Sequence, residues 1–250
     1  MLILLPPSEG KTRPETGTPL DLTSLSSPEL NPVRGQLLKA LIKLSGTKNA
    51  AEVLGLGPKL HGELEHNRHL LEAPTARADE IYTGVLFSEL DPASLEVAAH
   101  ARLSERVAIA SALFGLVRPS DQIPAYRLSG SVTLPRLGTV SSRWKPVLPE
   151  TISRLADGGL VVDLRSGTYV ALGKPEKLVA ATTIRVLHEA NGKRSVVSHF
   201  NKATKGRIVR QLLTENVEAS TIEQFGAALR DLGYVVEIDG ARIDVIVSEI

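Results

Sequence analysis

The stretch MLILLPPSEGKT, residues 1–12, places a short apolar run directly before a polar loop. Residues 1–5 predict a buried strand, which ends at Pro6 and Pro7. The closing Gly-Lys-Thr is typical of a nucleotide-binding P-loop, but that motif needs a glycine where Leu5 stands. Two prolines also occupy the arc where backbone N–H groups would face phosphate. We therefore expect a rigid loop that presents side chains rather than a phosphate cradle.

The composition is that of a soluble globular protein. The chain has 250 residues, of which 42% are hydrophobic and 23% are charged. The absence of cysteine excludes disulfides, thiolate metal sites and a cysteine nucleophile. No apolar run reaches the roughly 18–20 residues of a membrane span, and the first residues do not read as a signal peptide. We expect a cytoplasmic protein with no membrane partner.

The charge is unevenly distributed along a chain whose net charge is only +1. Residues 211–250 contain eight acidic and two basic residues, which leaves 20 acidic and 27 basic residues in 1–210. A net positive main body favours a polyanionic partner. An acidic C-terminal face without such a partner would give the same numbers.

Helical and strand patterns mix along the chain. The segment 81–90 begins like a strand, residues 106–115 predict a buried strand, and 160–170 predict another that ends in a polar turn. Asn191-Gly192 and Asp239-Gly240 predict hairpins. Helices are expected near 32–45, 91–105, 142–157, 201–216 and 220–232. Because these elements show no regular strand–helix–strand rhythm, we predict a mixed α/β (α+β) fold, one compact domain over 1–250, rather than a doubly wound sheet.

The segment VLGLGPKLHGEL (53–64), within 47–70, has the pattern of a helix–hairpin–helix element. Gly55 and Gly57 permit a tight turn, so that N–H groups at the start of the next helix can face a DNA phosphate beside Lys59. Such an element grips the backbone without reading bases. A plain helix–helix turn, with glycine as a C-cap and Pro58 as a helix start, explains the same residues. Nearby histidines and glutamates are interpreted as a solvated helix face, so no metal site is predicted.

The segment SHFNKATKGRIVRQ (198–211) is the densest basic stretch of the chain. Lys202, Lys205, Arg207 and Arg210 follow one another with no acid between them, behind Asn201 as an expected N-cap. This pattern fits a helix face that contacts phosphates. An ordinary solvated face is the alternative.

Two further loops concentrate polar side chains after predicted strands. The first, GLVRPSDQIPAYRLSG (115–130), contains Arg118, Asp121, Tyr126 and Arg127 in a proline-stiffened segment. Such a loop suits ligand binding, although internal arginine–carboxylate pairing would also explain its residues. The second, DLRSGTYV (163–170), is a weaker signal of the same kind.

Six segments in order resemble the YaaA family of bacterial peroxide-stress proteins. They are LLPPSEGKT, IYTGVLF, GLVRPSDQIPAYRL, SSRWKPVL, VVDLRSGTYV and VVSHFNKATKGRIVR. The resemblance implies a mixed α/β fold with a basic cleft and a helix–hairpin–helix element. It also implies binding of double-stranded DNA and a role in limiting iron-driven oxidative damage. The family's motif positions fall on Lys11, Thr12, Tyr82, Thr83, Gly84, Arg118, Pro119, Asp121, Tyr126, Arg127, Ser166, Tyr169, Lys202, Gly206 and Arg210.

Two functions remain open at this point, and neither requires a bound cofactor. The first is sequence-independent binding of duplex DNA through Gly55, Gly57, Lys59, Lys202, Lys205, Arg207 and Arg210. The second is an enzyme acting on a nucleobase or nucleotide in one polar cleft. The cleft residues expected for it are Glu9, Lys11, Thr12, Tyr82, Thr83, Arg118, Asp121, Tyr126, Arg127, Ser166, Tyr169 and Lys202. Binding of the DNA phosphate backbone does not require such a mixture of acids, hydrogen-bond donors and phenols, whereas a small-ligand site does.

Overall fold

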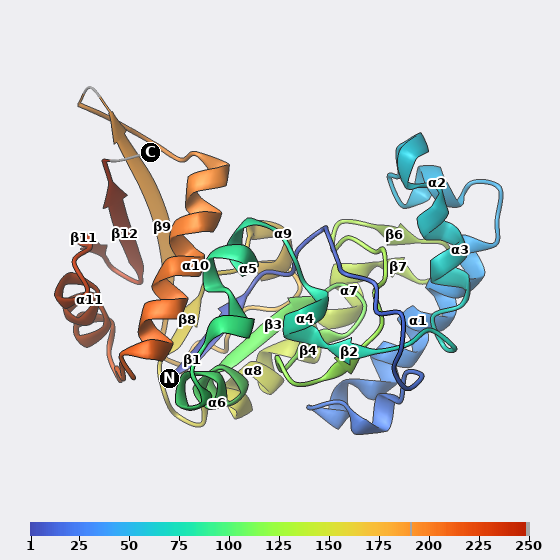
Figure 1. Cartoon of the computed structure of the whole chain (residues 1–250), viewed down its shortest axis with the longest axis horizontal. Coiled ribbons are helices and arrows are strands. Elements are labelled where there is room, and N and C mark those ends of the chain that lie inside the picture. The colour runs from blue at the N-terminus through green and yellow to red at the C-terminus, as the bar shows by residue number, and fades with distance from the viewer. Residues whose placement is uncertain (191, 249–250) are drawn as a thin grey trace.

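The opening strand forms the centre of the sheet in the computed structural model, which describes residues 1–190 and 192–248 (Figure 1). β1 (Leu2–Leu5) pairs in parallel with β3 (Val107–Ser111) on one side and β8 (Val161–Asp163) on the other. All four residues of β1 are buried. A continuous apolar run of this kind is what a parallel strand covered on both faces requires.

Beyond β8 the sheet continues in parallel through β9 (Ala181–Ala190) and β12 (Arg242–Val247). Its margins are antiparallel: β4 (Gly115–Val117) pairs with β3, β11 (Val235–Asp239) with β12, and β10 (Lys193–Ser195) with β9. The mixed α/β class is therefore confirmed. The mostly parallel order was not predicted, because the connections between parallel strands are long and contain several short elements rather than one helix each.

Helices pack around this sheet and extend beyond one end of it. α10 (Ser198–Thr214) packs against β9 and against α5 (Val85–Leu90), and α11 (Ile222–Asp231) packs against β11. Figure 1 shows α1 (Asn31–Ser45), α2 (Ala50–Val53) and α3 (Gly62–Arg68) at the end of the molecule away from α10 and α11. Further helices are α6 (Val97–Arg106), α7 (Val140–Trp144) and α8 (Leu148–Ala156). Two small antiparallel strand pairs lie outside the main sheet: β2 (Ala76–Arg77) with β5 (Gln122–Ile123), and β6 (Thr133–Leu134) with β7 (Gly138–Thr139). No helix within the described ranges is long and apolar enough to cross a membrane.

The prediction of a strand at the start of 81–90 is wrong. The segment is mostly helical. α4 (Ala78–Ile81) and α5 (Val85–Leu90) are separated by residues 82–84, of which Tyr82 forms an isolated β-bridge with Lys11 and Gly84 has φ 95°. The buried residues Leu86, Phe87 and Leu90 follow helical spacing and form the face that packs on α10. The helix expected near 91–105 instead begins at Val97, because residues 92–94 form a 3₁₀ turn.

The other expected elements are confirmed. The helices near 32–45 and 220–232 are α1 and α11, the basic helix is α10, and the expected helix at 142–157 is divided into α7 and α8. Both hairpins form, although Asn191 itself lies outside the described residues. The sole tryptophan, Trp144, is fully buried and donates to the carbonyl of Ala112 at 2.8 Å.

Candidate functional site

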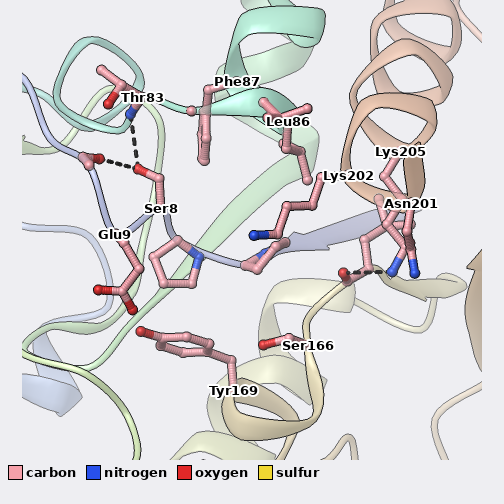
Figure 2. Close-up of a pocket in the computed structure, with 16 residues that line it drawn as sticks. Ser8, Glu9, Thr83, Leu86, Phe87, Ser166, Tyr169, Asn201, Lys202 and Lys205 are labelled. Atoms are coloured by element: carbon pink, nitrogen blue, oxygen red, sulfur yellow. Dashed lines mark hydrogen bonds between the residues drawn. The ribbon is translucent and has the colours of Figure 1, made fainter. Parts of the chain in front are cut away.

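A cavity of about 550 Å³ opens where β1 and β8 end, covered on one side by α5 and α10 (Figure 2). The carboxyl ends of parallel strands are the edge at which α/β proteins collect polar side chains. The lining residues are Pro6, Pro7, Ser8, Glu9, Gly10, Thr83, Gly84, Val85, Leu86, Phe87, Leu164, Ser166, Tyr169, Asn201, Lys202 and Lys205. Apolar walls with a few polar groups are typical of a small-ligand site.

The PPSEGKT loop forms one wall of this cavity and is fixed by hydrogen bonds to the segment around Thr83. The Ser8 hydroxyl donates to the carbonyl of Gly10 and accepts from the Thr83 N–H at 2.9 Å (Figure 2). The Thr12 N–H donates to the carbonyl of Ile81 at 2.8 Å. A Cβ added at Gly10 would lie 2.9 Å from the Thr83 hydroxyl oxygen, so the close approach favours glycine there. The loop therefore serves as a rigid wall, as its prolines predicted.

A buried ion pair fixes the end of β8. The Arg165 guanidinium donates to both carboxylate oxygens of Asp163, at 2.8 and 2.7 Å, and to the carbonyls of Tyr169 and Gly173. Both side chains are almost fully buried. This clamp holds α9 (Gly167–Val170), which carries Tyr169 at the cavity. The hydroxyl of Ser166, the residue before α9, makes no hydrogen bond with any described residue.

α10 supplies the cationic wall. The Lys205 ammonium donates to the carbonyl of Leu164 at 3.2 Å, and burial lowers the pKa of Lys205 to about 8, only partly offset by the charge of Asp163. Figure 2 shows Lys202 extending from α10 into the centre of the cavity, between Phe87 and the α9 segment. Within the described part of the chain, Lys202 has neither an ion pair nor a hydrogen bond. Both lysines are therefore placed to face an anionic group.

Asn201 adds an unsatisfied acceptor to the same wall. Its Oδ1 atom is buried and has no hydrogen-bond partner among the described residues. The sequence suggested Asn201 as an N-cap, but α10 begins at Ser198 and Asn201 lies in its first turn. The i,i+4 spacing of Asn201 and Lys205 places both on one face of the helix. That spacing was the available signal for a site residue that the sequence analysis did not select.

Lys11 lies behind the cavity rather than in its lining. Its ammonium is 4.5 Å from the ring centre of Tyr126 and 5.5 Å from that of Tyr82, and it donates to the carbonyl of Ser8 at 3.0 Å. Burial lowers the pKa of Lys11 to about 8 and raises the pKa of both tyrosines. The tyrosine hydroxyls are 3.0 Å apart, and that of Tyr126 is 2.7 Å from the Ser111 hydroxyl. These groups form a packed polar core that supports the loop wall.

Arg127 connects the cavity to the predicted helix–hairpin–helix segment. Its guanidinium lies 2.9 Å from the carboxylate of Glu9 and donates to the Glu9 carbonyl at 3.1 Å. The buried side chain of Asn67, on α3, accepts from the N–H of Arg127 and donates to its carbonyl. A second hollow of about 680 Å³ contains Glu9, Arg127 and Gly55 in its walls. Glu9 thus borders both spaces.

The structure places Arg118 and Asp121 away from the cavity lining. The Asp121 carboxylate accepts from the N–H and hydroxyl of Ser26 and from the N–H of Arg118. The Arg118 guanidinium donates to the carbonyl of Val107 at 3.0 Å. Both side chains fix the 115–130 loop, but through Ser26 and backbone groups rather than through the arginine–carboxylate pairing within the loop that was the alternative.

Arg207 and Arg210 also have partners within the protein. Arg207 forms an ion pair with Glu89 of α5 at 2.8 Å. Arg210 donates to the carbonyls of Leu90 and Asp91, each at 2.9 Å, and to the Ser94 hydroxyl at 2.9 Å. Of the four basic residues on α10 predicted to contact phosphate, only Lys202 and Lys205 line the cavity.

The glycine turn at 53–64 is exposed but its helices are shorter than expected. α2 is a single turn, Gly55 adopts φ 65°, and residues 58–60 form a 3₁₀ turn before α3 begins at Gly62. A Cβ added at Gly55 or Gly57 would meet nothing within 4 Å, and Lys59 is exposed. The nearby His69 binds Glu65 and Glu72, and no group of three His, Asp or Glu residues in the described ranges is arranged to hold a metal.

Comparison with known proteins shows similarity to one protein family over most of the chain. A sequence model of the family described as peroxide stress protein YaaA matches residues 1–239. A UPF0246 protein of Streptomyces coelicolor is 47% identical over 100% of both chains, and one of Corynebacterium efficiens is 44% identical over 97% of both. An uncharacterized protein of Campylobacter jejuni is 31% identical over 82% of both. The chain therefore belongs to the YaaA family of peroxide stress proteins.

Proposed function

We propose that this protein acts in the cytoplasm during peroxide stress by binding duplex DNA without sequence preference, and that this limits iron-driven damage. The observation that carries the proposal is the pair of lysines, Lys202 and Lys205, that line the strand-end cavity. Neither forms an ion pair with a carboxylate of the described residues. Unpaired lysines facing a concave site attract phosphate. The family's description as peroxide stress proteins supports the physiological setting.

The exposed turn at Gly55–Lys59 supplies a second contact in this proposal. It borders the hollow that Glu9 and Arg127 share, which in turn adjoins the lysine cavity. A duplex lying across both spaces would meet Lys59 at one end and Lys202 at the other. The glycines leave room for close approach of a phosphate, since no atom lies within 4 Å of a Cβ built on either.

A comparison of the variants Lys202→Met and Arg207→Gln tests whether Lys202 contacts a DNA phosphate at the cavity. We expect Lys202→Met to weaken binding to a random-sequence duplex by about tenfold, because it removes one charge-assisted phosphate contact. The control Arg207→Gln removes the same charge from the same helix, but this guanidinium is held by Glu89, so we expect a change within about twofold. Fluorescence anisotropy measures both. Equal losses in the two variants would indicate nonspecific attraction to α10 rather than a site at the cavity.

The lowered pKa of Lys205 predicts a pH dependence of DNA binding. A bound anion favours the charged amine, so affinity should be highest below pH 8 and fall as pH rises through the pKa of about 8. Lys205→Met should bind more weakly at pH 7 and lose the step near pH 8. Lys11 has a similar pKa but does not line the cavity, so Lys11→Met should retain the step. A step that disappears in Lys11→Met and persists in Lys205→Met would contradict the assignment.

A second candidate function is an enzyme that acts on a nucleobase or nucleotide. The favouring observation is the largely apolar cavity beside the Ser166 hydroxyl and a lysine with a pKa of about 8. Backbone binding alone needs no such space, whereas catalysis on a small group does. Incubation with DNA or free nucleotides, followed by mass spectrometry of the products, would test this candidate.

A further inference from the structure

We infer that the cavity receives one nucleotide that has left the base stack of the bound DNA, with Asn201 contacting the base edge and Lys202 its phosphate. This inference rests on the proposed DNA binding and adds what the cavity holds. The residues that carry it are Asn201, Lys202, Phe87 and Tyr169, all of which line the space.

The shape and lining of the cavity fit a single base with its sugar. Its volume of about 550 Å³ lies in the range of about 300–1,000 Å³ that is usual for small-molecule sites. Phe87 and Tyr169 approach it from different sides (Figure 2), and Pro6 and Pro7 also line it. Aromatic rings and prolines offer flat apolar surfaces on which a base can lie, and such contacts do not depend on base identity.

The unsatisfied Asn201 carboxamide indicates a ligand that carries a hydrogen-bond donor. A buried acceptor without a partner costs free energy, which a ligand N–H would recover once the carboxamide of Asn201, a residue of the cavity lining, turns toward the ligand. Every nucleobase presents at least one N–H on its edge. The neighbouring Lys202 ammonium has no partner in the described part of the protein and can hold the phosphate of the same nucleotide. A nucleotide would supply an N–H for the Asn201 oxygen and a phosphate for the Lys202 ammonium.

The position of the cavity indicates that the base must be unstacked. It lies between the PPSEGKT loop, α5, α9 and α10, so a base still stacked inside a duplex could not enter it. Proteins that contact a single base in this way rotate the nucleotide out of the helix. The unstacking costs a few kcal/mol and costs least for a mismatched base. The structure therefore predicts preferential binding to DNA with a weakened base pair.

The test compares two duplexes that differ in one base pair, one fully paired and one with a central mismatch that contains 2-aminopurine. We expect the mismatched duplex to bind at least about tenfold more tightly than the paired duplex, and its 2-aminopurine fluorescence to change on binding. Asn201→Leu, close in size, and Ser166→Phe, which fills the cavity from an exposed position, should reduce that preference to within about twofold. Lys39→Met, an exposed charge on α1, is the matched control and should keep the preference.

Equal affinity for the two duplexes in the wild-type protein would overturn the inference while leaving duplex binding intact. A preference that persists undiminished in both Asn201→Leu and Ser166→Phe would also overturn it, because the base would then be held elsewhere. If neither duplex binds, the proposed DNA binding fails first and the inference fails with it. Circular dichroism of each variant separates loss of the preference from loss of the fold.

Discussion

Replacing Asp163 with alanine is expected to lower the free energy of unfolding by about 3–5 kcal/mol, because it leaves the guanidinium of Arg165 buried without its partner. The two side chains are 4% and 0% exposed, so water cannot compensate for the lost carboxylate. The pair also joins the end of β8 to α9, and its loss should displace Ser166 and Tyr169 from the cavity. Urea unfolding measures the stability change, and DNA affinity measures the displacement.

Two controls separate the buried charge from a general effect of substitution. Glu237→Ala removes one of the two carboxylate partners of an exposed arginine, Arg194, which keeps Glu189, and should cost less than about 1 kcal/mol. The double variant Asp163→Leu with Arg165→Met removes both charges and should recover much of the stability lost by the single variant. A loss below 1 kcal/mol in Asp163→Ala would show that the ion pair does not hold this end of the sheet.

Replacing Gly206 with alanine is expected to lower the free energy of unfolding by about 1–3 kcal/mol through overpacking. The added Cβ would lie 2.3 Å from the carbonyl oxygen of Leu86 and 3.1 Å from the backbone nitrogen of Leu90. Because both atoms belong to the α5 backbone, the two helices must separate. That movement shifts Lys202 and Lys205 relative to the PPSEGKT loop, so DNA affinity should fall together with stability.

Gly35→Ala is the matched control for this prediction. Gly35 is also in the interior of a helix, α1, but a Cβ added there meets nothing within 4 Å. Alanine should therefore stabilise the protein by about 0.5–1 kcal/mol through helix propensity. Thermal unfolding of the two variants gives opposite shifts if close packing of α5 and α10 is the cause. A stabilising effect of Gly206→Ala would contradict the observed helix contact.

Much of the fold could be predicted from local pattern. The apolar runs of β1 and β3 identified the buried strands, and Asp239-Gly240 identified a hairpin. Residues 81–90 were misread because Gly84 interrupts a segment too short to show helical period from the sequence alone. The parallel order of β9, β8, β1 and β3 depends on contacts between distant segments, which no local pattern contains.

The site residues divide according to the contacts they make. Sequence reasoning selected Lys202, Lys205, Ser166 and Tyr169, which line the cavity, but also Arg207 and Arg210, which the fold uses to join α10 to the α5 region. A basic residue with an internal partner and one without look identical in sequence. Asn201 was overlooked as a ligand contact because the evidence for it is one buried oxygen atom without a hydrogen-bond partner among the described residues. The packing of α10 determines that burial, and the sequence does not show it.

The salt dependence of duplex binding tests the central claim most directly. Anisotropy titrations of a random-sequence duplex between about 50 and 200 mM salt give the slope of log affinity against log salt concentration. We expect a slope that corresponds to several phosphate contacts in the wild-type protein and a slope smaller by about one in Lys202→Met. Binding that is absent at about 50 mM salt, or a slope that Lys202→Met leaves unchanged, would contradict DNA recognition at this cavity.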